Sequence, residues 1–191
     1  MKTIIAVLDK RGADTARTVV RVLKSLHIEH SDGFGIATPS TFTMEKDADA
    51  LQNQDINSPV SVGYTFSKIL PQDKPQHALL ENATLVFEGR IYSPMRKTSA
   101  TEIVAKKLKQ NHDRAIEALF DEIEGDFSFI IAESKRIIAG RDPIGVQPLY
   151  YGENRVVAAL ASNRKALWTL GIEKTQSFPP GNIAYVSRKG F

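Results

Sequence analysis

Hydrophobic residues follow strand-like and helix-like patterns in separate blocks of the chain. Apolar runs rich in β-branched residues predict strands, at residues 3–8, 60–66, 84–91, 127–132, 136–140, 149–151, 156–161 and 183–186. Apolar residues at three- and four-residue spacing predict helices, starting at Asp14, Ser99 and Asp113. A glycine turn at 32–36 enters a further strand, and a short helix is expected at Trp168. Residues 43–59 are polar and poorly periodic, which predicts a surface loop.

The order of these elements favours an α+β class, because strands and helices come in blocks and do not alternate strictly. Short polar turns between the strands from 127 to 161 suit antiparallel pairing. A Rossmann-type sheet is disfavoured, since the pair Gly33-x-Gly35 lacks the third glycine and follows a helix.

Length and composition indicate one globular domain spanning residues 1–191. Apolar residues make up 42% of the 191 residues and charged residues 25%, as in ordinary soluble domains. The apolar run from Met1 to Asp9 is too short to span a bilayer or to act as a typical signal peptide. We therefore expect a cytoplasmic protein with no membrane partner.

Charge and residue usage exclude several kinds of chemistry. The net charge is +3, but lysines and arginines are scattered among nearly as many acids, so no nucleic-acid partner is expected. The absence of cysteine excludes disulfides, thiolate metal sites and a thiol nucleophile. The histidines show no metal-ligand spacing, so we expect surface or turn positions and neither a metal nor a cofactor, at His27, His30, His77 and His112.

Two segments of the chain form distinctive motifs, G-D-F-S-F at residues 125–129 and G-R-D-P-I-G-V-Q-P-L-Y-Y-G at residues 140–152. They resemble the G-x-F-A-F and A-R-D-x-x-G-x-x-P-L-Y-Y signatures in the amidotransferase domain of glutamine-hydrolysing asparagine synthetases, a class II (Ntn-hydrolase) family. The resemblance continues at 161–167 and 179–181, and upstream matches lie at 32–36 and 85–92. The resemblance implies an Ntn-hydrolase αββα sandwich of two stacked, mainly antiparallel sheets flanked by helices. We interpret the block from Arg141 to Gly152 as structural, not catalytic.

The resemblance also implies that the catalytic positions are degenerate. In the family an amino-terminal cysteine attacks the glutamine amide, with its own amine as general base, and Lys2 occupies that position here. The family's Asn-Gly oxyanion hole corresponds to Glu88-Gly89, and an ionised glutamate cannot donate a hydrogen bond. Of this pair, only Gly89 keeps the family's role, which is to donate its backbone N–H to the oxyanion.

Two positions that bind the substrate backbone in the family are also changed. The arginine that grips the glutamine carboxylate corresponds to Glu29, and the aspartate that holds the amino group corresponds to Ala100. We therefore expect no catalytic or substrate-binding residues of the family type, and we hypothesise that Lys2 and Glu88 pair and close the vestigial pocket. One alternative is an active amidohydrolase using Thr3 after trimming of two residues, although a one-residue shift along a strand turns the side chain to the opposite face.

The resemblance implies a pseudoenzyme in asparagine biosynthesis, a structural or regulatory module for a synthetase that uses free ammonia. The expected partner is an asparagine-synthetase-type synthetase domain or subunit. An alternative is a recycled binding module for another small molecule or a protein. The sequence leaves open whether Met1 is retained, whether a homo-oligomer forms, and whether the native chain continues into a synthetase domain.

Overall fold

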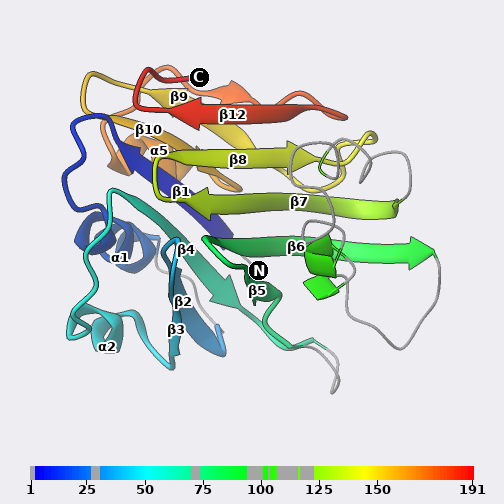
Figure 1. Cartoon of the computed structure of the whole chain (residues 1–191), viewed down its shortest axis with the longest axis horizontal. Helices are drawn as coiled ribbons and strands as arrows, with labels where there is room; N and C mark the ends of the chain where they lie inside the picture. The colour runs from blue at the N-terminus through cyan, green and yellow to red at the C-terminus, as the bar shows by residue number, and fades with distance from the viewer. Residues whose placement is uncertain are drawn as a thin grey trace.

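The chain folds into two antiparallel sheets packed face to face, with helices on the outside (Figure 1). The computed structural model describes residues 3–26, 31–69, 74–93, 101–102, 104–106, 116 and 123–191. Its strands are β1 (Thr3–Asp9), β2 (Gly33–Ala37), β3 (Phe42–Glu45), β4 (Val60–Phe66), β5 (His77–Leu79), β6 (Ala83–Ser93), β7 (Glu124–Glu133), β8 (Arg136–Arg141), β9 (Tyr150–Glu153), β10 (Val157–Ala161), β11 (Gln176–Ser177) and β12 (Ile183–Ser187). Its helices are α1 (Ala16–Ser25), α2 (Ala48–Gln52) and α5 (Arg164–Thr169).

The sheets have seven and five strands. The larger sheet has the order β11-β9-β10-β1-β4-β2-β3, and the smaller has the order β12-β8-β7-β6-β5. Period-two alternation gives each sheet an inner and an outer apolar face. In β1, Ile4 and Ala6 belong to the core between the sheets, whereas Ile5 and Val7 pack in a second core with α1 and α5. A third core covers the outer face of the smaller sheet and includes helical residues Val104 and Ile116. The predicted α+β sandwich is therefore confirmed.

The predicted loop at 43–59 is wrong, because this segment contains part of β3 and the whole of α2. β3 pairs with β2, although its four residues are too few to show a clear pattern. The side chain of Asp47 accepts a hydrogen bond from Ala50 N and caps α2, which buries Leu51, as aspartate commonly does at this position. The short strands β5 and β11 were also not predicted.

The first helix begins one residue later than expected. Thr15, not Asp14, occupies the N-cap position, and its hydroxyl bonds to Ser58 O and Ser61 Oγ. The carboxylate of Asp14 nevertheless accepts a hydrogen bond from Ala16 N at 3.0 Å and so satisfies a free amide of the first turn. The helix starts predicted at Ser99 and Asp113 lie outside the described residues.

Antiparallel pairing of neighbouring strands between residues 127 and 161 is confirmed for the first pair and the last pair of these four strands. The second and third strands, β8 and β9, do not pair with each other. β7 pairs with β8, and β9 pairs with β10. β8 and β9, however, lie in different sheets, so the loop at 142–149 crosses from one layer to the other.

His77 lies in β5 and not in a surface turn. Its ring stacks on Phe42 of β3, with 3.5 Å between ring centroids, and so joins the edges of the two sheets. Burial lowers the pKa of His77 below its ordinary value of 6.5, because a buried imidazole loses the hydration of its charged form. His27, His30 and His112 lie outside the described residues.

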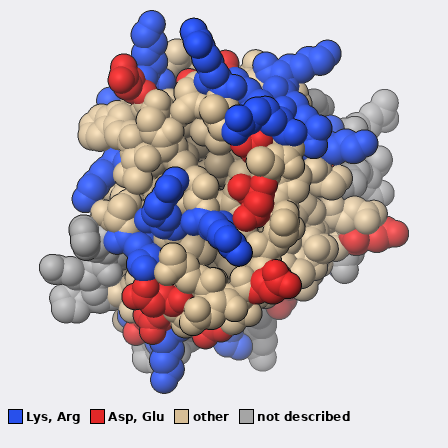
Figure 2. All heavy atoms as spheres, turned by 90° about the vertical axis from the view of Figure 1, so that its left-hand side faces the viewer, with Lys and Arg blue, Asp and Glu red and all other residues tan. Residues whose placement is uncertain are grey.

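The surface carries mixed charge on the face shown in Figure 2, where lysine and arginine side chains lie among aspartates and glutamates. Within the described ranges, no helix has the length and apolar character needed to cross a membrane.

Candidate functional site

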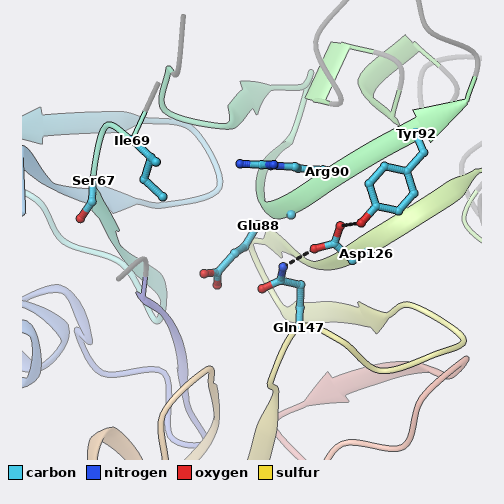
Figure 3. Close-up of a pocket in the computed structure, with 8 residues that line it drawn as sticks. Ser67, Ile69, Glu88, Arg90, Tyr92, Asp126 and Gln147 are labelled. Carbon is cyan, nitrogen blue, oxygen red and sulfur yellow. Dashed lines mark hydrogen bonds between the residues drawn. The ribbon is translucent and has the colours of Figure 1, made fainter. Parts of the chain in front are cut away.

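A pocket of about 370 Å³ opens where β4 ends beside the inner face of the smaller sheet (Figure 3). Its lining combines carboxylates, an amide, a guanidinium and apolar groups: Ser67, Ile69, Glu88, Gly89, Arg90, Tyr92, Asp126 and Gln147. These residues come from the end of β4, from β6 and β7, and from the loop between β8 and β9.

The alternation of β6 explains why two charged residues, Glu88 and Arg90, reach this pocket. Val86 belongs to the core between the sheets, and Leu85 and Phe87 belong to the outer core. Residues two and four positions after Val86 face the same side of the sheet as Val86. These residues are Glu88 and Arg90, and both line the pocket.

Glu88 and Gly89, the positions predicted to replace the oxyanion pair, both lie in the pocket. Glu88 is only 7% exposed. Gly89 has a φ of +128°, and a Cβ there would collide with the carbonyl oxygen of Asp126. Its own carbonyl accepts a hydrogen bond from Gln76 Nε2 at 3.2 Å. Only glycine fits this position, where β6 passes close to the backbone of β7.

Asp126 joins two other pocket residues in a hydrogen-bonded chain that the sequence did not reveal. The Tyr92 hydroxyl donates to one carboxylate oxygen, and Gln147 Nε2 donates to the other. The hydrogen bond to the Asp126 carboxylate raises the pKa of Tyr92 above its ordinary value of 10.0, because only the neutral phenol can donate that bond. All three residues lie within motifs that match the family, so nothing in the sequence distinguished them from the other motif residues or predicted that they are in contact.

The loop at 142–149, which delivers Gln147, is held by the buried carboxylate of Asp142. That carboxylate accepts hydrogen bonds from five backbone amides, those of Phe127, Ile144, Gly145, Val146 and Gln147. A carboxylate that accepts so many N–H bonds acts as a rigid anchor for the turn.

Arg141 also holds this loop, because its side chain binds backbone carbonyl oxygens. Its guanidinium donates to Gln147 O at 2.6 Å, Gly145 O at 2.6 Å and Phe178 O at 2.8 Å. Arg141 and Asp142 are therefore engaged with backbone groups, which agrees with the structural interpretation of the block from Arg141 to Gly152.

Thr3 lies on the face of β1 opposite the pocket. It shares the side of Ile5 and Val7, which pack in the outer core with α1. Its backbone amide donates to Thr65 Oγ1 at 2.8 Å, within the pairing of β1 and β4.

The remaining predicted positions cannot be compared with the geometry. Lys2, Glu29 and Ala100 lie outside the described residues, and the Lys2–Glu88 pair therefore stays a prediction. Among the residues that are described, no three histidine, cysteine, aspartate or glutamate side chains gather as a metal site would require.

Comparison with known proteins agrees with this architecture. The glutamine amidotransferase domain family matches residues 89–169. A putative glutamine-hydrolysing asparagine synthetase of Methanocaldococcus jannaschii is 28% identical over 189 residues, which cover 89% of this chain and 34% of that protein. Glutamine-hydrolysing asparagine synthetase 2 of Arabidopsis thaliana is 32% identical over 132 residues, covering 62% of this chain and 22% of that protein.

Among solved structures, the glutamine phosphoribosylpyrophosphate amidotransferase of B. subtilis, complexed with ADP and GMP, has the same fold. Its TM-score is 0.76 at 18% identity, over 98% of this chain and 48% of that chain. The present chain thus spans about a third or less of the length of the two synthetases, and about half of the solved structure. The chain therefore has the Ntn-hydrolase fold of class II glutamine amidotransferases, and its sequence is similar to glutamine-hydrolysing asparagine synthetases but contains no cysteine.

Proposed function

We propose that this domain does not hydrolyse glutamine and serves as a structural or regulatory module of an asparagine-synthetase-like protein in the cytoplasm. The observation that carries the proposal is the absence of cysteine from the whole sequence. Thioester formation needs a thiolate, and a lysine ammonium at position 2 cannot replace it. Without that nucleophile the two-step hydrolysis has no first step.

The chemistry of the pocket supports the same proposal. Glu88 is buried, and its carboxylate would repel the negative charge that develops on the amide oxygen during attack. Losing one oxyanion donor costs about 3–4 kcal/mol of transition-state stabilisation. A negative charge in its place raises the barrier further through repulsion.

We further propose that the Lys2 ammonium compensates the charge of Glu88 and closes the pocket. The resemblance supports this pairing, because the two corresponding positions face one another in the family. Breaking a buried pair by removing one partner costs about 3–5 kcal/mol, whereas removing both costs far less. Unfolding of Lys2→Met, Glu88→Gln and the double variant in urea measures this coupling, and additive losses would exclude the pair.

The supported role is that of a partner for a synthetase domain or subunit that uses free ammonia. The two synthetase relatives are much longer than this chain, so their matched regions are joined to further polypeptide. A domain that retains the amidotransferase fold without the nucleophile can still support such a partner through contacts.

The experiment that tests the proposal is an ammonia-release assay on the purified chain with glutamine as substrate. We expect no release above the buffer rate, both for the wild type and for Thr3→Ala. Release by the wild type that is lost in Thr3→Ala would favour the amidohydrolase that uses Thr3. An intact mass that includes Met1 and Lys2 would exclude that alternative, because its nucleophile must be amino-terminal.

A second candidate function is a binding module for another small molecule or a protein, favoured by the open pocket of about 370 Å³. A ligand that binds only the folded state raises the melting temperature. A thermal-shift screen of metabolites therefore distinguishes this candidate, and we expect no shift with glutamine.

A further inference from the structure

The segment that contains β5 connects the two sheets at their edges and also contacts the pocket. β5 is an edge strand of the smaller sheet, and β3 is an edge strand of the larger sheet (Figure 1). The His77 ring of β5 stacks on the Phe42 ring of β3, with 3.5 Å between centroids and 8° between planes. Beside it, Gln76 Nε2 donates to the carbonyl of the pocket residue Gly89 at 3.2 Å.

β5 has few contacts to hold it in place. It has three residues, all of them paired with β6, and none of the three is fully buried. One further backbone bond, from Phe87 N to Gln76 O at 2.9 Å, extends this pairing toward the pocket. Short edge segments with little buried surface open at a lower free energy than the whole domain. β5 can therefore open while the rest of the sandwich stays folded.

The His77 ring is placed where a positive charge is unfavourable. Its Nδ1 atom is buried and has no hydrogen-bond partner in the part of the chain that the structure describes. A protonated imidazole donates from both nitrogens, so protonation would leave an unpaired donor and a charge in this position. Burial accordingly lowers the pKa of His77.

The charged side chains around His77 do not compensate for this cost. Those on or beside the neighbouring segments are Glu45, Lys46, Lys74, Glu81, Glu88 and Arg90. Glu45 accepts a hydrogen bond from Gln54, and Glu88 lies on the pocket side, two positions beyond Val86, the residue paired with His77. The other four are exposed. The pKa of His77 is lowered in their presence, and burial is the cause.

We propose that residues 76–79, which we call the latch, are a pH-sensitive device: protonation of His77 releases its ring from Phe42, detaches β5 from β6 and frees the Gly89 carbonyl at the pocket. The closed latch holds a neutral ring, whereas the detached latch exposes the ring to water, where it takes up a proton at a pH of about 6.5. A falling pH therefore favours the detached state. This device does not depend on the proposed function, because it involves no glutamine chemistry.

Amide hydrogen exchange, followed by NMR on the 191-residue chain, tests the latch. The reporter is the amide of Phe87, and the reference is the amide of Val7 in the buried strand β1. We expect Phe87 to be protected at least about tenfold less than Val7, because β5 opens without global unfolding. From pH 7.5 to pH 5.5, the protection of Phe87, corrected for intrinsic exchange, should fall about threefold to tenfold; an unfolded pKa of about 6.5 sets the upper limit. The side-chain amide of Gln76 should lose protection over the same range.

The variant His77→Phe keeps a ring against Phe42 but cannot take up a proton. Its protection at Phe87 should change less than about twofold over this pH range. If circular dichroism shows that this variant is unfolded, His77→Leu takes its place. The matched control replaces the other three histidines with glutamine, at His27, His30 and His112, and should keep the pH dependence of the wild type.

Several results would overturn the latch. Equal protection of Phe87 and Val7 would show that β5 opens only with the whole domain. A pH dependence that persists without the His77 imidazole, or that disappears in the control, would assign the effect to another group. Constant protection of Phe87 between the two pH values would exclude the device altogether. Loss of protection at Phe87 without any change at the Gln76 side chain would overturn the link to the pocket.

Discussion

At the scale of single residues, the pocket depends on a glycine and two acids in neighbouring strands. Gly89 permits β6 to approach β7, and this approach brings Glu88 and Asp126 to one cavity. The family motif identified Glu88 and Gly89 from the sequence. It did not identify the role of Asp126, because its partners Tyr92 and Gln147 are distant in the chain and only the folded sheets bring them together.

Replacing Gly89 with alanine should destabilise the protein strongly. The new Cβ would collide with the Asp126 carbonyl oxygen, and the φ of +128° at this position is unfavourable for any other residue. We expect a loss of about 3 kcal/mol or more in the free energy of unfolding, measured in urea.

The matched control is Gly171→Ala. Gly171 has a φ of +72°, but the nearest atom to its added Cβ lies 3.9 Å away. The left-handed conformation alone costs about 1–2 kcal/mol. Equal losses at both positions would show that close packing of β6 against β7 is not what requires glycine at 89.

The pKa of His77 makes stability depend on pH. Because burial lowers this pKa in the folded state, the unfolded chain takes up the proton first as the pH falls. The contribution of His77 is therefore complete above its unfolded pKa of about 6.5 and is lost as the pH falls from there through the folded pKa.

The variant His77→Phe tests this prediction and keeps an aromatic ring against Phe42. Urea titrations between pH 7.5 and about 5 should show a smaller loss of stability for the variant than for the wild type. Parallel curves over this range would assign the pH dependence to other groups.

At the scale of elements, long strands were predictable and short connections were not. β1, β4, β6 and β7 carry apolar runs that fill the cores, and their positions follow from the sequence within a few residues. The four residues of β3 and the five of α2 show too little periodicity, and β3 depends on pairing with β2.

The loop at 142–149, which crosses between the sheets, shows a second reason why the sequence did not predict the connections. Its length suits a hairpin, yet β8 pairs with β7 and β12, whereas β9 pairs with β10 and β11. Which sheet a strand joins depends on long-range packing that local patterns do not contain.

We expect Asp142→Asn to destabilise this loop far more than a surface change would. An amide keeps one acceptor but turns an NH₂ group toward backbone N–H groups that the carboxylate had satisfied. The predicted loss is at least about 3 kcal/mol in urea unfolding.

The control is Glu153→Gln, which removes the charge from the partly exposed ion pair with Lys10 at 2.8 Å. Such pairs contribute about 1 kcal/mol or less. If Asp142→Asn falls within the range of this control, the hydrogen bonds of Asp142 do not anchor the loop.

At the scale of the whole molecule, the two sheets share one inner core. Residues of both sheets, such as Val62 of β4 and Ile130 of β7, belong to the same buried cluster. We therefore predict that residues 1–191 unfold in one cooperative transition. Near-ultraviolet and far-ultraviolet circular dichroism should give coincident melting curves, and separate midpoints would contradict a single domain.

The fold as a whole was predictable because motifs spread along the chain matched one family, and the absence of cysteine was visible directly. The contacts that give the pocket its shape were not, since Tyr92, Asp126 and Gln147 meet only across β6, β7 and the crossing loop. The sequence therefore predicts which catalytic groups of the family are missing, and the structure adds which groups line the pocket.

The most direct measurement of the central claim follows glutamine labelled with ¹⁵N in its side-chain amide by NMR during long incubation with the purified chain. A glutamine-hydrolysing asparagine synthetase serves as the positive control. We predict that the label stays in glutamine at the rate of the buffer alone, while the control releases labelled ammonium. Enzyme-dependent release of labelled ammonium by this chain, in proportion to its concentration, would contradict the account.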